Sequence, residues 1–186
     1  DAATRRNLEI SETLRGDPAP TLLSLFDTCA TSMGSRWLRH CLHHPLTDRQ
    51  VAASRHGAVT DLLERSVSMK KALQGFADIE RITARIALTS ARPRDLSGLR
   101  DSLARLPSIQ ASVGADVECR LSTADPLHGR EAVPRETPAT PPSSSALLMH
   151  LVEALATPQA CLNILTQAVI AEPAALIRDG GVIAAG

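Results

Sequence analysis

The fold of this chain is decided by residues 33–106, and the clearest part of that stretch reads DIERITARIALTSARPRDLSGLRDSLARL (residues 78–106). Isoleucines recur there at helical spacing and predict a helix over residues 78–89. A second helix is predicted from Pro93, because proline is tolerated in a helix's first turn, and Pro107 is expected to help stop it. Each helix carries one apolar stripe, which is typical of helices packed in a bundle. The stripes are Ile79, Ile82 and Ile86 in the first helix, and Leu96, Leu99, Leu103 and Leu106 in the second.

Further helices are predicted on both sides of this stretch. Thr21 is a suitable N-terminal cap for a short helix, and a longer helix from Met33 ends at Pro45. Thr47 and Gln50 form a capping box that starts the next helix. Thr157 and Pro158 are interpreted as the cap and first position of the last helix. The apolar faces are Leu22, Leu25 and Phe26; Met33, Trp37, Leu38, Cys41 and Leu42; Val51, Val59, Leu62 and Leu63; Leu147, Leu148, Leu151, Val152 and Leu155; and Cys161, Leu162, Leu165 and Val169.

Short strands are expected near the two ends of the chain. Leu8 and Ile10 alternate with polar neighbours, as in a short edge strand, and Val182 and Ile183 follow a Gly-Gly turn. Residues 122–145 are rich in proline and serine, so they are expected to be a flexible insertion. The predicted fold is therefore mainly α, a helical bundle-like domain with short β-strands near its ends. Its parts are a helical segment (1–121), the insertion (122–145), and further helices with a strand (146–186).

Composition and charge restrict the classes of function that this chain is expected to have. Net charge is zero overall, but residues 31–106 carry 13 basic and 7 acidic side chains, a surplus suited to phosphate or an acidic partner. No apolar run is long enough for a membrane span, so no membrane partner is expected. The widely spaced cysteines predict reduced, partly buried thiols in a cytoplasmic protein; they are Cys29, Cys41, Cys119 and Cys161. Both ends of the sequence look cut, and we expect a piece of a longer protein.

No catalytic, cofactor-binding or metal-binding residue is predicted. Cys41, His43 and His44 lie beside His40, but four zinc ligands with workable geometry are not available. Histidines at a helix C-terminus are more simply explained by their favourable interaction with the helix dipole. No sequence context marks a nucleophile, and neither a Gly-x-x-x-x-Gly-Lys-Ser/Thr nor a Gly-x-Gly-x-x-Gly loop is present to hold a nucleotide. An enzyme is the least favoured class.

Arginine pairs along the chain leave two interpretations open. They are able to touch DNA phosphates, but aromatic residues for base stacking are nearly absent. Structural ion pairs are the more economical interpretation, for example Arg94 or Arg100 with Glu80 or Asp101. A weak, non-specific DNA-binding module acting through residues 31–106 remains an alternative, and so does a stand-alone helical adaptor that binds another protein. The pairs are Arg5 and Arg6, Arg81 and Arg85, and Arg92 and Arg94.

Several blocks of sequence occur in an order and spacing that point to a known family. They are DAATRRNLEI (1–10), MGSR (33–36) with Leu38, LHHPL (42–46), DIERI (78–82) with Ala84 and Arg85, ARPRDL (91–96), and RDGGVI (178–183). Together they closely resemble the MutS family of bacterial DNA mismatch-repair proteins. The resemblance covers residues 1–109 densely and residues 146–186 more loosely. It implies the first segment of the family's core, or lever, domain.

The resemblance implies a mechanical role inside a larger protein. In that family the whole protein is a homodimer that binds mismatched double-stranded DNA, uses ATP and ADP with magnesium, and recruits MutL. The lever is expected to couple the DNA-clamp end to the ATPase end, with little or no direct DNA contact of its own. The family's Phe-x-Glu wedge is absent, since Phe26 precedes Asp-Thr and Phe76 precedes Ala-Asp. The segment is also expected to expose an apolar face that the parent protein buries.

Overall fold

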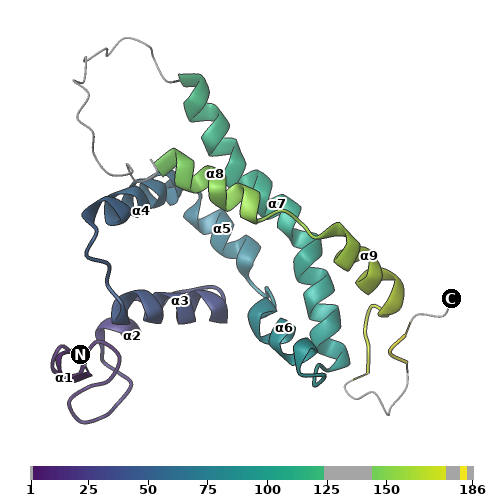
Figure 1. The fold of residues 1–186 in the computed structure, drawn as a ribbon, viewed down its shortest axis with the longest axis horizontal. Helices are drawn as coiled ribbons and strands as arrows, with labels where there is room; N and C mark the ends of the chain where they lie inside the picture. The colour runs from purple at the N-terminus through teal and green to yellow at the C-terminus, as the bar shows by residue number, and fades with distance from the viewer. Residues whose placement is uncertain (1, 124–143, 175–180, 184–186) are drawn as a thin grey trace. The chain divides into compact units, whose positions relative to one another are not determined.

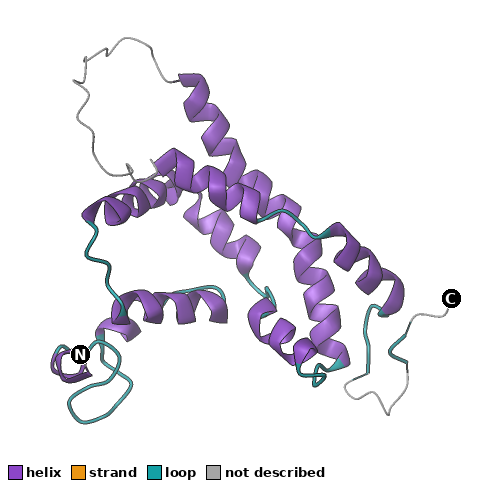
Figure 2. Ribbon diagram, in the orientation of Figure 1, coloured by secondary structure: helices purple, strands orange, loops and turns teal. Residues whose placement is uncertain are grey.

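The computed structural model describes residues 2–123, 144–174 and 181–183; for residues 115–123 and 144 it describes the helix backbone alone (Figure 1). The predicted insertion, residues 122–145, thus lies almost entirely outside the described residues. The described chain is mainly helical, as predicted (Figure 2). Its elements are α1 (Ala2–Asn7), α2 (Leu22–Phe26), α3 (Ser32–His43), α4 (Arg49–Leu62), the 3-10 turn η1 (Leu63–Arg65), α5 (Ser66–Leu73), α6 (Ile79–Ala87), α7 (Pro93–Thr123), α8 (Ser144–Ala154) and α9 (Gln159–Ala168).

The predicted strands near the chain ends are wrong. Residues 2–7 form helix α1, and the described residues contain no strand, only an isolated antiparallel bridge between Val169 and Ile183. Alternation over so few residues carries little weight, because a strand also needs a partner along its length. At the end of α1 the chain turns at Glu9, whose φ is 47°. The Ile10 and Glu9 amides bond back to the carbonyls of α1, which ends the helix.

The same kind of turn ends α6. Thr89 has a φ of 51°, and its amide donates to the Ile86 carbonyl at 3.0 Å. The Ser90 amide donates to the Arg85 carbonyl at 2.8 Å. This is the Schellman arrangement, which favours glycine because a side chain strains the left-handed backbone. A β-branched threonine therefore occupies the one position of the α6–α7 corner where glycine fits best.

Helix starts are predicted to within one or two residues. Thr21 caps α2 as predicted, through a reciprocal pair of hydrogen bonds with Ser24. Asp48, not Thr47, caps α4, because its carboxylate accepts the Gln50 amide at 2.8 Å. The last helix is also displaced, since Pro158 takes the cap position with a ψ of 84° and α9 begins one residue later. A proline in the non-helical cap position does not act as the first helical residue.

Helix α7 continues through Pro107, so the prediction that this proline helps to stop the helix is wrong. An internal proline costs about 3 kcal/mol, because it removes one backbone hydrogen bond and crowds the preceding turn. The leucine stripe does not end at Pro107: Leu106 on one side and Ile109 and Val113 on the other are all buried. Burying these side chains contributes about 1.5–3 kcal/mol each and offsets the cost of the proline.

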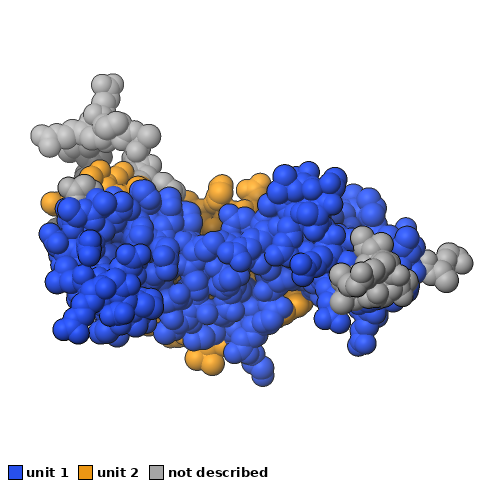
Figure 3. All heavy atoms as spheres, turned by 90° about the horizontal axis from the view of Figure 1, so that it is seen from below, with its two compact units in different colours: residues 1–45, 70–104, 158–186 blue, residues 46–69, 105–157 orange. Residues whose placement is uncertain are grey.

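The chain divides into two compact units, each described by itself (Figure 3). Unit 1 consists of Asp1–Pro45, Lys70–Ala104 and Pro158–Gly186, and unit 2 of Leu46–Met69 and Arg105–Thr157. In unit 2, α4 packs against α8. Its core contains Ala58, Val113 and Leu148, surrounded by Leu62, Met69, Leu147, Val152 and Leu155. The buried apolar residues of unit 1 are Leu23, Ile82, Leu99, Leu103, Leu165 and Val169.

The predicted apolar stripes are buried to different degrees. In α7, Leu99 and Leu103 are each only 4% exposed, as the pattern predicts. In α3 no residue is buried, and Trp37 is 60% exposed. The stripe predicted for α3 is therefore half-buried, with Trp37 as its exposed member. Among the described helices, none is both long enough and apolar enough to cross a membrane.

Replacing Leu99 or Leu103 with alanine is expected to lower the free energy of unfolding by about 2–5 kcal/mol each, because each change leaves a cavity in the core of unit 1. Urea unfolding followed by circular dichroism measures the loss. Leu88→Ala is the matched control, since that side chain is 75% exposed and its removal leaves no cavity. Equal losses in L88A and L103A would contradict this assignment of the core.

Thr89→Gly is expected to raise the free energy of unfolding by up to about 1 kcal/mol, because glycine relieves left-handed backbone strain at the end of α6. The control is Thr83→Gly, an exposed position inside the same helix. There the change is expected to cost about 0.3 kcal/mol, the difference between the helix propensities of threonine and glycine. Thermal unfolding of the two variants should shift in opposite directions, and a loss in both would show that the corner does not need a left-handed residue.

Candidate functional site at the helix junctions of unit 1

Helix α6 starts at Asp78, whose carboxylate serves several partners. As the N-terminal cap, its Oδ1 accepts the Arg81 amide at 3.2 Å. Its Oδ2 accepts the Ser32 hydroxyl, at the start of α3, at 2.9 Å. A cap residue that also binds a side chain of another helix fixes where α6 begins and where α3 lies beside it.

Arg36 of α3 completes this junction. Its guanidinium donates to both carboxylate oxygens of Asp78, at 2.6 and 2.8 Å, and also to Glu80 at 2.5 Å. The two side chains of the bidentate pair are 33% and 18% exposed, and the residues are 42 positions apart in the sequence. A fork-to-fork pair fixes orientation as well as distance. Arg36 therefore links α3 to the first turn of α6.

These contacts keep both groups charged. The hydrogen bonds from Arg36, followed by those from Ser32 and the Arg81 backbone, hold the pKa of Asp78 well below its ordinary value of 3.8, although burial acts against them. The carboxylates of Asp78 and then Glu80 raise the pKa of Arg36. Neither group releases or takes up a proton near neutral pH, so the pair is a fixed joint and has no acid–base chemistry.

A second carboxylate joins α6 to α7. Asp95, in the first turn of α7, accepts the Arg92 amide at 2.9 Å and the Arg85 guanidinium at 2.8 Å. Arg85 comes from the last turn of α6, so one carboxylate stabilises the start of one helix and the end of the other. Burial alone would raise the pKa of Asp95, but the Arg92 amide and the Arg85 charge lower it below its ordinary value.

Close packing supports this corner from within. Ser102 is 2% exposed, and its hydroxyl oxygen accepts the Ala77 amide at 2.9 Å. A Cβ placed on Gly98 would lie 3.3 Å from the Cβ of Ala77, which is tighter than normal packing. The loop before α6 therefore lies directly against α7, where a small residue and a buried hydroxyl are required.

Arg100 connects α7 with the chain that leaves α9. Its guanidinium donates to the backbone carbonyls of Val169 and Ile170, both at 2.9 Å, and of Ala171 at 3.2 Å. Its Nε donates to Asp101 at 2.8 Å, and the side chain is 15% exposed. The carbonyls at the end of a helix lack partners within the helix, so a cation placed there is favourable.

Some of the arginines considered as DNA contacts have structural partners. Arg100 pairs with Asp101 as predicted, and Arg85 pairs with Asp95. Arg81 lies 3.6 Å from Asp78. Glu80 pairs with Arg36, which sequence reasoning did not consider as an ion-pair partner. Asp78 carried a usable signal, because an acidic residue directly before an apolar helix is a typical cap. Nothing in the local sequence identifies Arg36 as its partner.

The histidine group of α3 does not form a metal site. The Trp37 and His40 rings stack at 5.5 Å, His40 and His44 lie 4.7 Å apart, and His43 instead reaches the Ser11 hydroxyl at 2.9 Å. Burial, with the charges of Arg5, Arg39 and His44, lowers the pKa of His43. No group of three or more His, Cys, Asp or Glu among the described residues is arranged to hold a metal ion.

The cysteines are only partly as predicted. Cys29, Cys41 and Cys161 are free thiols, but Cys29 and Cys161 are exposed and only Cys41 is half-buried. The side chain of Cys119 lies outside the described residues.

A comparison with protein families matches residues 3–185 to the model described as MutS domain III. The chain belongs to the MutS family. The match spans both compact units, and it confirms the resemblance drawn from the sequence blocks. In the MutS family this part is a non-catalytic core domain of a mismatch-repair protein. The junctions built by Asp78, Asp95 and Arg100 therefore belong to a non-catalytic core domain.

The Asp78 junction is expected to make the stability of the chain depend on pH. Because the pKa of Asp78 is lower in the folded state, the unfolded chain binds more protons near 3.8. The stability from this carboxylate is therefore full above about pH 5 and is lost as the pH falls toward the folded-state pKa. Asp78→Asn should be less stable than the wild type at pH 7, and the difference should shrink at pH 3.5.

Urea titrations of both proteins at several pH values measure this difference. Asparagine keeps the size and the capping oxygen of aspartate, so D78N isolates the charge. Asp78→Ala removes the cap as well and should cost about 0.5–2 kcal/mol more than D78N. A gap between wild type and D78N that stays constant from pH 7 to pH 3.5 would contradict the ion-pair assignment.

Proposed function

We propose that this chain is the first part of the lever of a MutS mismatch-repair protein, and that it couples a DNA-clamp end to an ATPase end of that protein. The observation that supports the proposal best is α7, one continuous helix of 31 residues. At 1.5 Å per residue such a helix spans about 47 Å. A helix of that length, held at defined points, carries a displacement over a distance that separate short helices do not.

The ways in which α7 is held also support a lever. Asp95 and Arg85 fix its first turn to α6, and Ser102 fixes it to the loop before α6. Asp78 and Arg36 in turn fix α6 to α3. Coupling between distant sites requires packed elements that move together and have alternative arrangements. A bidentate ion pair fixes the angle between its two side chains as well as their distance. Contacts of this kind therefore transmit a rotation of one helix to the next, as well as a displacement.

Partners and cofactors are proposed for the whole protein only. They are mismatched double-stranded DNA, a second copy of the protein, MutL, and ATP or ADP with magnesium. The residues of this chain do not fit a nucleotide: the sequence has no glycine-rich phosphate loop, and the described residues offer no cluster of magnesium ligands. We therefore assign no step of ATP hydrolysis and no direct mismatch contact to this chain.

The two alternatives find less support. A DNA-binding module acting through residues 31–106 would use its arginines on phosphates, yet Arg36, Arg85 and Arg100 are committed to carboxylates and carbonyls. A stand-alone adaptor would need no long helix with charged joints at its turns. The exposed Trp37 face of α3 is compatible with an adaptor, but it equally fits a surface covered by the rest of a MutS protein.

Lowering the helix stability of α7 in a full-length MutS protein that contains this domain tests whether the domain acts as a lever. Ala104 and Ala111 are exposed on α7, and glycine at each costs about 1 kcal/mol of helix stability without removing a side-chain contact. In A104G/A111G the factor by which ATP weakens binding to mismatched DNA is expected to fall by about fivefold or more. DNA affinity without nucleotide and ATP affinity without DNA should change little.

Ala52→Gly with Ala53→Gly is the matched control, because both positions are exposed on α4 and lose the same helix propensity. The control should keep the wild-type coupling factor. An unchanged factor in A104G/A111G would contradict a lever that works through α7. Salt-sensitive duplex binding by the 186-residue chain alone would instead favour the DNA-binding module.

A further inference from the structure

We infer that Arg100 is a positioning residue that fixes residues 169–171 to α7, so that a displacement of α7 is passed to the chain leaving α9. The inference deepens the proposed function and rests on it for the coupling step alone. The contact itself is independent of that function. It joins residues that lie 69 to 71 positions apart, all of them within unit 1.

The geometry singles out one side chain. Three successive backbone carbonyls converge on one guanidinium: Nη1 donates to Val169 and Ile170, and Nη2 donates to Ala171. The planar fork of arginine presents several donors in fixed directions, which a lysine ammonium does not. Asp101 accepts from Nε at 2.8 Å, so the guanidinium is held by a carboxylate as well as by the three carbonyls.

Residues 169–171 depend on this arginine because they have left helix α9 without entering a sheet. The Val169 amide still bonds to the Leu165 carbonyl, and the Ile170 amide bonds to the Val182 carbonyl at 3.2 Å. Their carbonyls, however, are held by Arg100. Val169 is 6% exposed and also forms the isolated bridge with Ile183. Backbone carbonyls near a buried residue need partners, and Arg100 supplies them from α7.

The position of Arg100 on α7 makes the contact useful for coupling. It lies one residue from the buried Leu99 and three residues before the buried Leu103, so the helix has little freedom to turn at this point. It also follows Asp95 and Gly98, where α7 meets α6 and the loop before it. A shift of α6 against α7 therefore reaches residues 169–171 through a short series of directional contacts.

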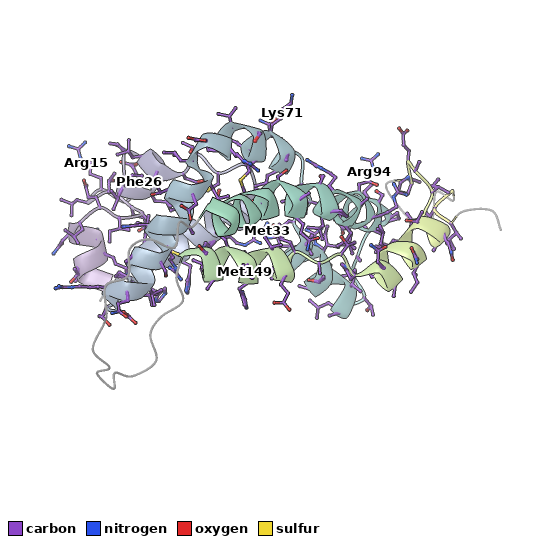
Figure 4. All side chains as sticks on the ribbon, turned by 90° about the horizontal axis from the view of Figure 1, so that it is seen from above. Arg15, Phe26, Met33, Lys71, Arg94 and Met149 are labelled. Atoms are coloured by element: carbon purple, nitrogen blue, oxygen red, sulfur yellow. The ribbon has the colours of Figure 1, made fainter. Side chains whose placement is uncertain are left out.

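Amide hydrogen exchange on the 186-residue chain tests the contact directly. In Arg100→Gln the Ile170 amide is expected to exchange roughly 10- to 100-fold faster, because the bridge to Val182 opens when the carbonyls lose a charged donor. The Ile82 amide of α6, which bonds to the Asp78 carbonyl, should change by less than about threefold. Arg94→Gln is the matched control, an exposed arginine on α7 that is labelled in Figure 4.

Arg100→Lys keeps the positive charge but removes the planar guanidinium, so it tests whether that geometry is needed. Exchange at Ile170 in R100K that is faster than in the wild type and slower than in R100Q supports the proposal. If R100Q fails to fold, exchange in R100K that is faster than in the wild type supports it. Exchange at Ile170 that matches the wild type in R100K shows that charge alone suffices and overturns the role of the fork. Acceleration that is equal at Ile82 and Ile170 overturns the proposal, because it reports general destabilisation.

The coupling step is tested in the full-length MutS protein. R100K is expected to lower the factor by which ATP weakens binding to mismatched DNA, while R94Q keeps it. Local opening at Ile170 with an unchanged coupling factor would overturn the positioning role, although the contact exists. If the wild-type protein itself shows no coupling, or A104G/A111G leaves it intact, the lever function fails instead, and the exchange result still stands by itself.

Discussion

The structure of unit 1 depends on the carboxylate of Asp78. It caps α6, accepts a hydroxyl from the start of α3 and receives both arms of the Arg36 guanidinium. A carboxylate offers about four acceptor positions, so one residue is able to satisfy a helix end and a neighbouring helix together. The helix dipole adds to this, because the start of α6 favours negative charge. Without this anion the first turn of α6 would lack its cap, and Arg36 would lose its main partner.

Elsewhere in unit 1, too, one charged side chain serves two elements. Asp95 stabilises the start of α7 and the end of α6, and Arg100 satisfies the carbonyls that follow α9. Each joint combines a helix end, which has unpaired backbone groups, with a charge from another element. Such joints are directional and cannot slide as an apolar interface does.

Part of the positive charge of residues 31–106 has a structural explanation. A surplus of arginine in a DNA-repair family invites an assignment as a DNA surface, but several of these arginines bind carboxylates or backbone carbonyls. Individually, exposed ion pairs contribute little to stability. Their value here is geometric, because each fixes the orientation of two helices. These joints leave Trp37 of α3 exposed.

The sequence by itself determined most of the helices, the family and the apolar stripe of α7. Local periodicity and capping residues are sufficient for that, since neighbours three and four residues apart decide a helix face. The sequence failed where the outcome depends on distant residues. Leu8 and Ile10 found no strand partner, and α7 passed through Pro107 because buried residues lie on both sides of it. The partners of Arg36 and Arg100 were likewise decided only in the tertiary structure. A hydrogen bond between residues 42 or 69 positions apart leaves no local pattern, because only folding brings donor and acceptor together.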